Sequence, residues 1–137
     1  MAGYSGTPLP QKLGIKDGHR VYVSRGGPAG LLPGVPTVKQ PHAPIDVAVL
    51  FVKTEAAYRA ALDTMHHALA ANGGLWIAWP KKSSGVKTDL TENLIRAIAV
   101  RETTLVDNKV CAIDDTWSGL RLVVRTEHRA AWLVPSR

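Results

Sequence analysis

The spacing of hydrophobic and polar positions between residues 45 and 80 predicts the centre of the fold. Residues 45–52 (IDVAVLFV) are almost wholly apolar and rich in β-branched side chains, which is typical of a strand buried on both faces. Residues 54–71 carry apolar side chains at helical spacing, and residues 75–79 (LWIAW) form a second apolar run. The helix provides a crossover long enough for two parallel strands, so we expect a strand, a helix and a parallel strand.

Two helices are predicted from capping signals and apolar stripes. The helix over 54–71 has Thr54 as its N-cap and Gly73 as the residue that ends it. A second helix is expected to begin near Thr88 and Asp89, because Asp89 and Glu92 have capping-box spacing.

The remaining segments complete an α/β domain. Residues 19–24 alternate as a first parallel strand, and 25–44 hold four Gly and five Pro, which predicts a loop. Residues 103–113 and 120–125 predict a C-terminal antiparallel hairpin with a turn at 114–119. We therefore expect a mostly parallel sheet in one domain over 1–126. The tail, 127–137, carries apolar residues that would dock back or bind a partner.

This order of elements resembles the later part of a class I S-adenosylmethionine-dependent methyltransferase. Residues 16–21 (KDGHRV) are similar to the approach to its first strand, and 72–76 (NGGLW) to the turn before its fifth. The resemblance implies a reduced Rossmann-like fold. It does not extend to the cofactor, because 25–30 (RGGPAG) lacks the glycine spacing, Pro28 removes a donor, and 25–44 contains no acid. We expect no usual S-adenosylmethionine binding and no other cofactor.

The whole chain also resembles a small uncharacterised bacterial family, catalogued as a domain of unknown function. The similar segments are 4–9 (YSGTPL), 12–15 (KLGI), 79–83 (WPKKS), 88–92 (TDLTE), 109–111 (KVC) and 116–122 (TWSGLRL). This resemblance implies membership and no activity.

Charge and composition narrow the function classes. The formal net charge is +6, and residues 1–44 hold five Lys or Arg against one acid. These cations are scattered, so nucleic-acid binding is a less favoured alternative. The single Cys111 excludes an internal disulfide, and no apolar run approaches the roughly 20 residues that span a bilayer. We expect a cytoplasmic protein that does not enter a membrane.

The strongest candidate site lies where the parallel strands end. Ligands of open α/β sheets bind beyond the carboxyl ends of the strands, and helix N-termini attract anions. The candidate anion-binding residues are Arg25, Lys53, Lys81, Lys82, Ser83, Lys87 and Thr88. The alternative is an ordinary solvated loop, in which Asp89 and Glu92 satisfy the helix amides and repel an anion.

Other residues give weaker signals. Trp79, Asp115 and Trp117 are candidates for an interface or pocket. Adjacent helical residues point about 100° apart, so His66 and His67 predict a surface pair rather than metal ligands. Cys111 is expected to be a buried thiol without nucleophilic activation. No catalytic or metal-binding residue is predicted.

Three functions remain open. The leading hypothesis is a non-catalytic binding or interaction domain with a protein partner. The second is a small enzyme or binder of a phosphate- or carboxylate-bearing small molecule at the Lys81 to Lys87 edge. The third is a nucleic-acid-associated basic protein.

Overall fold

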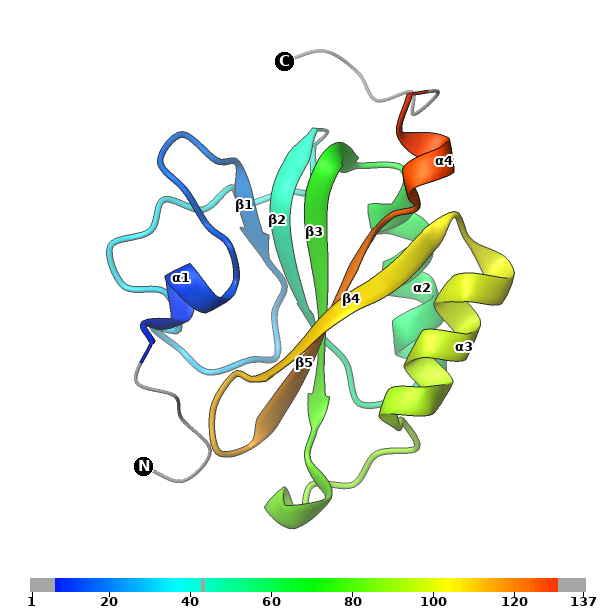
Figure 1. The fold of residues 1–137 in the computed structure, drawn as a ribbon. Helices are drawn as coiled ribbons and strands as arrows, with labels where there is room; N and C mark the ends of the chain where they lie inside the picture. Colours follow the sequence, from blue (N-terminus) through cyan, green and yellow to red (C-terminus); the bar gives the residue numbers. More distant parts are fainter. Residues whose placement is uncertain (1–6, 43, 131–137) are drawn as a thin grey trace.

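The computed structural model describes residues 7–42 and 44–130, and Figure 1 shows the arrangement of their helices and strands. The first half contains α1 (Leu9–Lys12), β1 (Val21–Val23), β2 (Ile45–Phe51), α2 (Glu55–His66) and β3 (Leu69–Pro80). The second half contains the 3-10 helix η1 (Lys82–Ser84), α3 (Glu92–Glu102), β4 (Leu105–Ala112), β5 (Trp117–Val124) and α4 (Thr126–Arg129).

The strands form one sheet in the order β1-β2-β3-β5-β4. The β1–β2 and β2–β3 pairs are parallel, and the β3–β5 and β4–β5 pairs are antiparallel. β4 is therefore an edge strand, and the register between β4 and β5 shifts between Asp107 and Lys109. Such a shift marks a β-bulge, which bends the strand and interrupts its ladder.

The two faces of the sheet are covered differently. In Figure 1, α2 and α3 lie on one side of the strands, and α1 with the irregular chain before β2 lies on the other. Two core clusters correspond to these sides: one contains Tyr58, Ile95 and Trp79, and the other contains Leu13 and Trp76. We call these the helical face and the open face.

Trp76 and Trp79 lie on opposite faces of β3, as the strand pattern predicts. The ring of Trp76 lies on the open face, in the cluster that contains Leu13, and not beneath α2 or α3. It is fully buried there, and its indole Nε1 donates to the carbonyl of Leu13, 3.1 Å away, just after α1. This bond fixes the N-terminal segment to the central strand.

The prediction of a reduced Rossmann-like, methyltransferase-like fold is wrong, although the α/β class stands. Half of the neighbouring strand pairs are antiparallel, so the sheet is mixed rather than mostly parallel. A doubly wound fold also places helices on both faces of its sheet. Here α2 and α3 cover one face, and the described residues between β1 and β2, 24–42 and 44, form no helix. Their Pro and Gly content cannot sustain one.

The predicted helix over 54–71 ends early, at His66. Leu69 pairs with Ile45 instead, and the Ile45 amide donates to the Ala68 carbonyl at 2.8 Å. Gly73 thus lies inside β3, where a Cβ atom would stand 2.8 Å from the Ile45 carbonyl oxygen. Gly73, which was predicted to end the helix, instead allows a close backbone approach within a strand.

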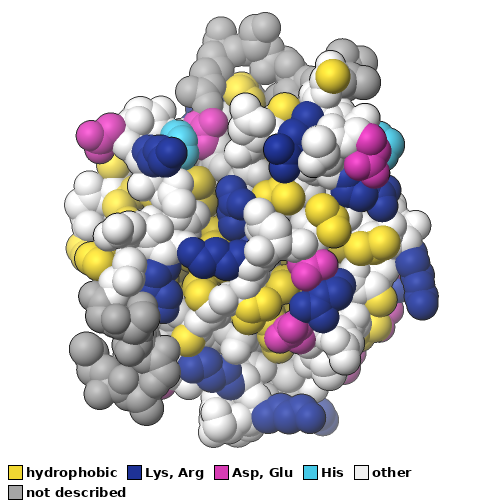
Figure 2. Space-filling model, viewed as in Figure 1, with side chains coloured by type: hydrophobic (Ala, Val, Ile, Leu, Met, Phe, Trp, Pro, Cys, Tyr) yellow, Lys and Arg dark blue, Asp and Glu magenta, His cyan; other side chains and the backbone are white. Residues whose placement is uncertain are grey.

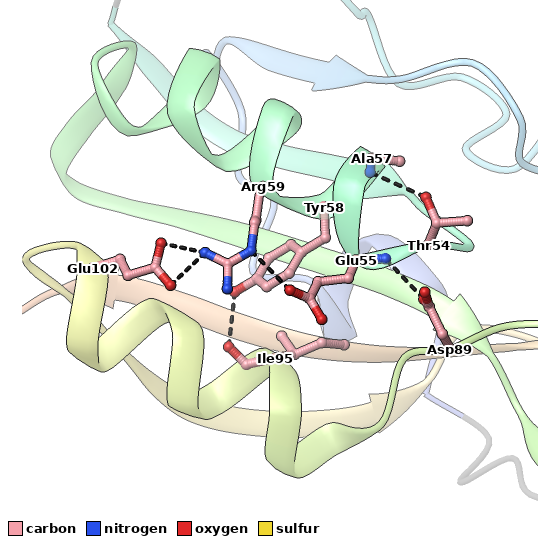
Figure 3. Close-up of polar contacts among 8 residues, drawn as sticks. All are labelled: Thr54, Glu55, Ala57, Tyr58, Arg59, Asp89, Ile95 and Glu102. Carbon is pink, nitrogen blue, oxygen red and sulfur yellow. Dashed lines mark hydrogen bonds and ion pairs between the residues drawn. The ribbon is translucent and has the colours of Figure 1, made fainter.

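Polar contacts fasten α2 to α3 (Figure 3). The Tyr58 hydroxyl, which is buried, donates to the Ile95 carbonyl at 2.8 Å. Burial raises the pKa of Tyr58 well above its usual value. At the surface, Arg59 pairs with Glu55 on its own helix and with Glu102 on α3. The hydroxyl bond is the part of this contact that water screens least.

Two further predictions concern the C-terminal tail and membrane-spanning helices. The apolar residues of the tail, Trp132, Leu133 and Val134, lie outside the described residues, so their docking stays a prediction. Among the helices of 7–42 and 44–130, none is long and apolar enough to cross a membrane.

The Tyr58 hydroxyl gives a test of the helical face. We expect Tyr58→Phe to lower the free energy of unfolding by about 1 kcal/mol, because the Ile95 carbonyl loses a buried donor. Tyr22→Phe is the matched control, since the Tyr22 ring is only partly buried. Chemical denaturation of both variants measures the difference. Equal stability of Tyr58→Phe and the parent would contradict this role for the hydroxyl.

Candidate functional site

The chain that leaves β3 is held in a defined course. The Lys81 amide donates to the Thr116 carbonyl at 2.8 Å, which ties this exit to the β4–β5 turn. The Ser84 hydroxyl donates back to the Lys81 carbonyl at 2.6 Å and closes the turn that contains η1. Lys81 and Lys82 therefore follow β3 on an ordered backbone at the edge where ligands of α/β sheets bind.

An open hollow of about 530 Å³ lies between this exit and the start of α3. We call it the β3–α3 hollow. It is lined by Trp79, Pro80, Lys81, Lys82, Leu90, Thr91, Glu92, Asn93 and Ser118. Two ammonium groups, two hydroxyls, an amide and one carboxylate thus surround an apolar floor, which is a composition that small-ligand sites use.

The first turn of α3 forms one wall of the β3–α3 hollow. Thr91 is the N-cap, and its hydroxyl accepts from the Leu94 amide at 3.1 Å. The amides of Glu92 and Asn93 precede the first intrahelical bond, so they have no acceptor within the helix. The positive end of the helix dipole points in the same direction.

Both acids expected to block these amides have other partners: Asp89 at the start of α2 and Glu92 within α3. Asp89 does not cap α3, because its Oδ1 accepts from the Glu55 amide at 2.8 Å, at the start of α2 (Figure 3). The Glu92 carboxylate accepts from Arg96 at 2.7 Å, and Arg96 also donates to Asp107 at 2.8 Å. These two hydrogen bonds, chiefly that to Asp107, raise the pKa of Arg96. The negative charge of Glu92 is thus opposed within its own helix.

The other candidate anion-binding residues do not line the hollow. Arg25, Lys53, Ser83 and Lys87 are exposed on the loops that follow the strands. The Thr88 hydroxyl donates to the Lys53 carbonyl at 2.6 Å and accepts from the Leu90 amide, so it joins two loops. Only Lys81 and Lys82 of the predicted set are brought together there.

The three residues predicted to form an interface or pocket lie in different places. Trp79 is 7% exposed and contributes to the floor of the hollow. Trp117 is also 7% exposed, and its ring packs edge-on against Phe51 with the centroids 4.9 Å apart. Asp115 is exposed in the turn, where its neighbour Asp114 accepts from the amides of Thr116 and Trp117. Trp117 therefore serves the core of the open face.

Sequence reasoning missed Asn93 and Ser118. Asn93 could have been identified from the sequence. Thr91 is a good N-cap residue, and a helix that begins after Thr91 rather than near Thr88 has Asn93 in its first turn. Ser118 gave no such signal, because it reaches the hollow only through the β3–β5 pairing, in which it faces Trp79.

Nucleophile and metal chemistry have little support in the described residues. Cys111 is partly buried, and this burial raises the pKa of its thiol, although Lys12 and Lys109 oppose the shift. Within 7–42 and 44–130, no group of three His, Cys, Asp or Glu side chains is placed to hold a metal ion.

Comparisons with known proteins found similarity to solved structures alone. No protein-family model matches the chain, and no curated protein matches it. A solved structure titled "A Pericyclic Reaction enzyme" is similar, with 13% sequence identity and a TM-score of 0.49, over 85% of this chain. The chain spans 39% of that structure, and a likeness at this level carries no argument about activity. Kinship with the small bacterial family stays a prediction.

The adjacent histidines at the end of α2 differ from each other. His66 is partly buried and its Nε2 lies 3.0 Å from the Thr104 hydroxyl, whereas His67 is exposed. Their rings meet edge-on with the centroids 5.1 Å apart. Burial lowers the pKa of His66, His67 lowers it further, and Asp63 raises it. The folded protein therefore disfavours the protonated form of His66.

This shift predicts the sign of a pH dependence. The unfolded chain protonates His66 near its ordinary pKa of about 6.5, before the folded chain does. Stability is then fully present above that pH and decreases as the pH falls through it. We expect His66→Gln to reduce the loss of unfolding free energy between pH 7.5 and 5.5, and His42→Gln, at an exposed site, to leave it unchanged. Denaturation at both pH values measures this, and an unaltered slope in His66→Gln would contradict it.

Proposed function

We propose that the protein is a non-catalytic binding domain that holds an anionic group, such as a phosphate or carboxylate, in the β3–α3 hollow. One observation carries the proposal: Asp89 is bonded to the start of α2, Glu92 is paired with Arg96, and Lys81 and Lys82 line the same hollow as the first turn of α3. An anion entering there meets helix amides and ammonium groups.

The hydrogen bonds that engage the carboxylates favour a binding role over a catalytic one. General acid–base chemistry needs a carboxyl group directed at the substrate. Glu92, the acid that lines the hollow, is held by Arg96, and Asp114 caps its own turn. The other polar side chains of the hollow are two lysines, two hydroxyls and the Asn93 amide, whose oxygen accepts from Arg96 at 3.1 Å. These groups are suited to holding an anion by charge and hydrogen bonds.

The proposed location and family of the protein rest on the sequence. We place the protein in the cytoplasm, which its single cysteine favours, and retain kinship with the small bacterial family as part of the same hypothesis. An anionic small molecule is the proposed ligand of the hollow.

Titration with inorganic phosphate tests the site. We expect saturable NMR shifts of the Lys81, Lys82, Glu92 and Asn93 amides. A Lys81→Gln, Lys82→Gln double variant should weaken binding by at least roughly ten-fold, since the loss of even one charge-assisted bond costs about 1.5 kcal/mol. Lys87→Gln is the matched control, because it removes a lysine of the same loop that does not line the hollow.

Two outcomes would contradict the proposal. Equal weakening by Lys87→Gln would mean that net charge alone attracts phosphate. Conversion of added pyrophosphate to orthophosphate, followed by ³¹P NMR, would show catalysis if the double variant lost it.

A further inference from the structure

A turn with two closing hydrogen bonds leads from α1 into β1. The His19 amide donates to the Lys16 carbonyl at 3.1 Å, and the Lys16 amide donates to His19 Nδ1, also at 3.1 Å. Gly18 has a φ of 81° within this turn, a conformation that glycine adopts without strain. Because Nδ1 accepts a hydrogen bond, the proton of the neutral ring is on Nε2, which can donate to a ligand.

A hollow of about 370 Å³ opens between this turn and residues 34–36, and we call it the α1–β1 hollow. Its apolar part contains Ile15, Val21 and Val35, which belong to the core cluster of the open face. A second hollow of about 250 Å³ shares His19 and Val21 with the first and extends it beside β1. Small-ligand pockets have volumes of about 300–1,000 Å³, so the α1–β1 hollow suits a small molecule.

The polar part of the α1–β1 hollow carries one charge of each sign. It is formed by Lys16, Asp17 and His19. The Lys16 and Asp17 side chains are exposed, and within 7–42 and 44–130 neither takes part in an ion pair or a side-chain hydrogen bond. An ammonium group, a carboxylate and an imidazole N–H are therefore available to a ligand beside one apolar wall.

The surface view agrees with this mixture of side chains. At the upper left of Figure 2, where Figure 1 shows the turn between α1 and β1, dark blue, magenta and cyan side chains lie near one another and beside yellow ones. The site is separate from the β3–α3 hollow. Trp79 and Leu90 of that hollow belong to the core cluster of the helical face, whereas Val21 and Val35 belong to that of the open face.

We propose that the α1–β1 hollow binds a free α-amino acid with an apolar side chain. The carboxylate of the ligand pairs with the Lys16 ammonium and accepts from His19 Nε2, and the ammonium of the ligand pairs with Asp17. The apolar side chain packs against Ile15, Val21 and Val35. Such a molecule carries both charges and an apolar group close together, which matches adjacent residues of opposite charge beside an apolar wall.

Ligands of a single charge fit the α1–β1 hollow less well. A phosphate or a simple carboxylate would pair with Lys16 and be repelled by Asp17, and an amine without a carboxylate would be repelled by Lys16. A metal ion would meet a single carboxylate beside an ammonium group. Across 7–42 and 44–130, no three His, Cys, Asp or Glu side chains are placed to hold one.

Titration of the full chain with L-leucine, followed by NMR, tests the proposal. We expect saturable shifts of the Asp17, Gly18 and Val35 amides. The compounds 4-methylpentanoate and 3-methylbutylamine keep the carbon skeleton of leucine, but the first lacks its ammonium group and the second its carboxylate. Each should bind at least roughly three-fold more weakly than leucine, which is the loss expected for one ion pair at an exposed site.

Two charge variants assign the contacts. Lys16→Gln should weaken leucine binding by roughly three-fold without weakening that of 3-methylbutylamine, and Asp17→Asn should weaken leucine binding equally without weakening that of 4-methylpentanoate. Lys53→Gln and Asp115→Asn are the matched controls, because both residues are exposed and lie outside the hollow. The Lys81→Gln, Lys82→Gln variant should bind leucine normally, so this proposal and the phosphate site can fail separately.

Three results would overturn the proposal. They are the absence of saturable shifts with leucine, binding of either analogue as tight as that of leucine, and equal weakening of leucine binding by the control variants. The comparison of the three ligands uses the unaltered chain, so it decides the outcome even if a variant fails to fold.

Discussion

The structure depends on the burial of β3 from both sides and along both edges. This strand hydrogen-bonds to β2 on one side and to β5 on the other, and residues Gly73 to Pro80 are all buried. A strand in this position must be covered on each face, because neither face can remain in water. On the helical face α2 and α3 provide the cover. On the open face, α1 and the irregular chain before β2 provide the cover. The Trp76–Leu13 hydrogen bond fixes the end of α1 to β3.

The same strand positions the residues of the β3–α3 hollow. Its carboxyl end brings Lys81 and Lys82 to the start of α3, and its antiparallel neighbour β5 supplies Ser118 to the same hollow. Its amino-terminal half carries Gly74, whose missing side chain makes room for Arg121. One central strand therefore positions side chains on both faces of the sheet.

Local signals in the sequence predicted local structure well. Thr54 caps α2 by accepting from the Ala57 amide, as its residue type predicts, and the two tryptophans of β3 alternate as strand residues do. The failures arose where a distant contact decided the outcome. Asp89 has capping-box spacing to Glu92, yet it caps a helix that begins 34 residues earlier. Lys109 and Arg121 look unrelated in the sequence, and only the β4–β5 register places them face to face. Strand order and register are set by the whole core, so no window of sequence contains them.

The bulge between Asp107 and Lys109 has a consequence for how this protein meets other chains. An edge strand with a regular ladder is a template on which another strand can add, and long flat edges lead to fibres. The irregularity in β4, with a lysine beside it, interrupts that template at the middle of the edge. Contacts with other chains at this side are thereby left to side chains rather than backbone, which favours reversible association over polymerisation.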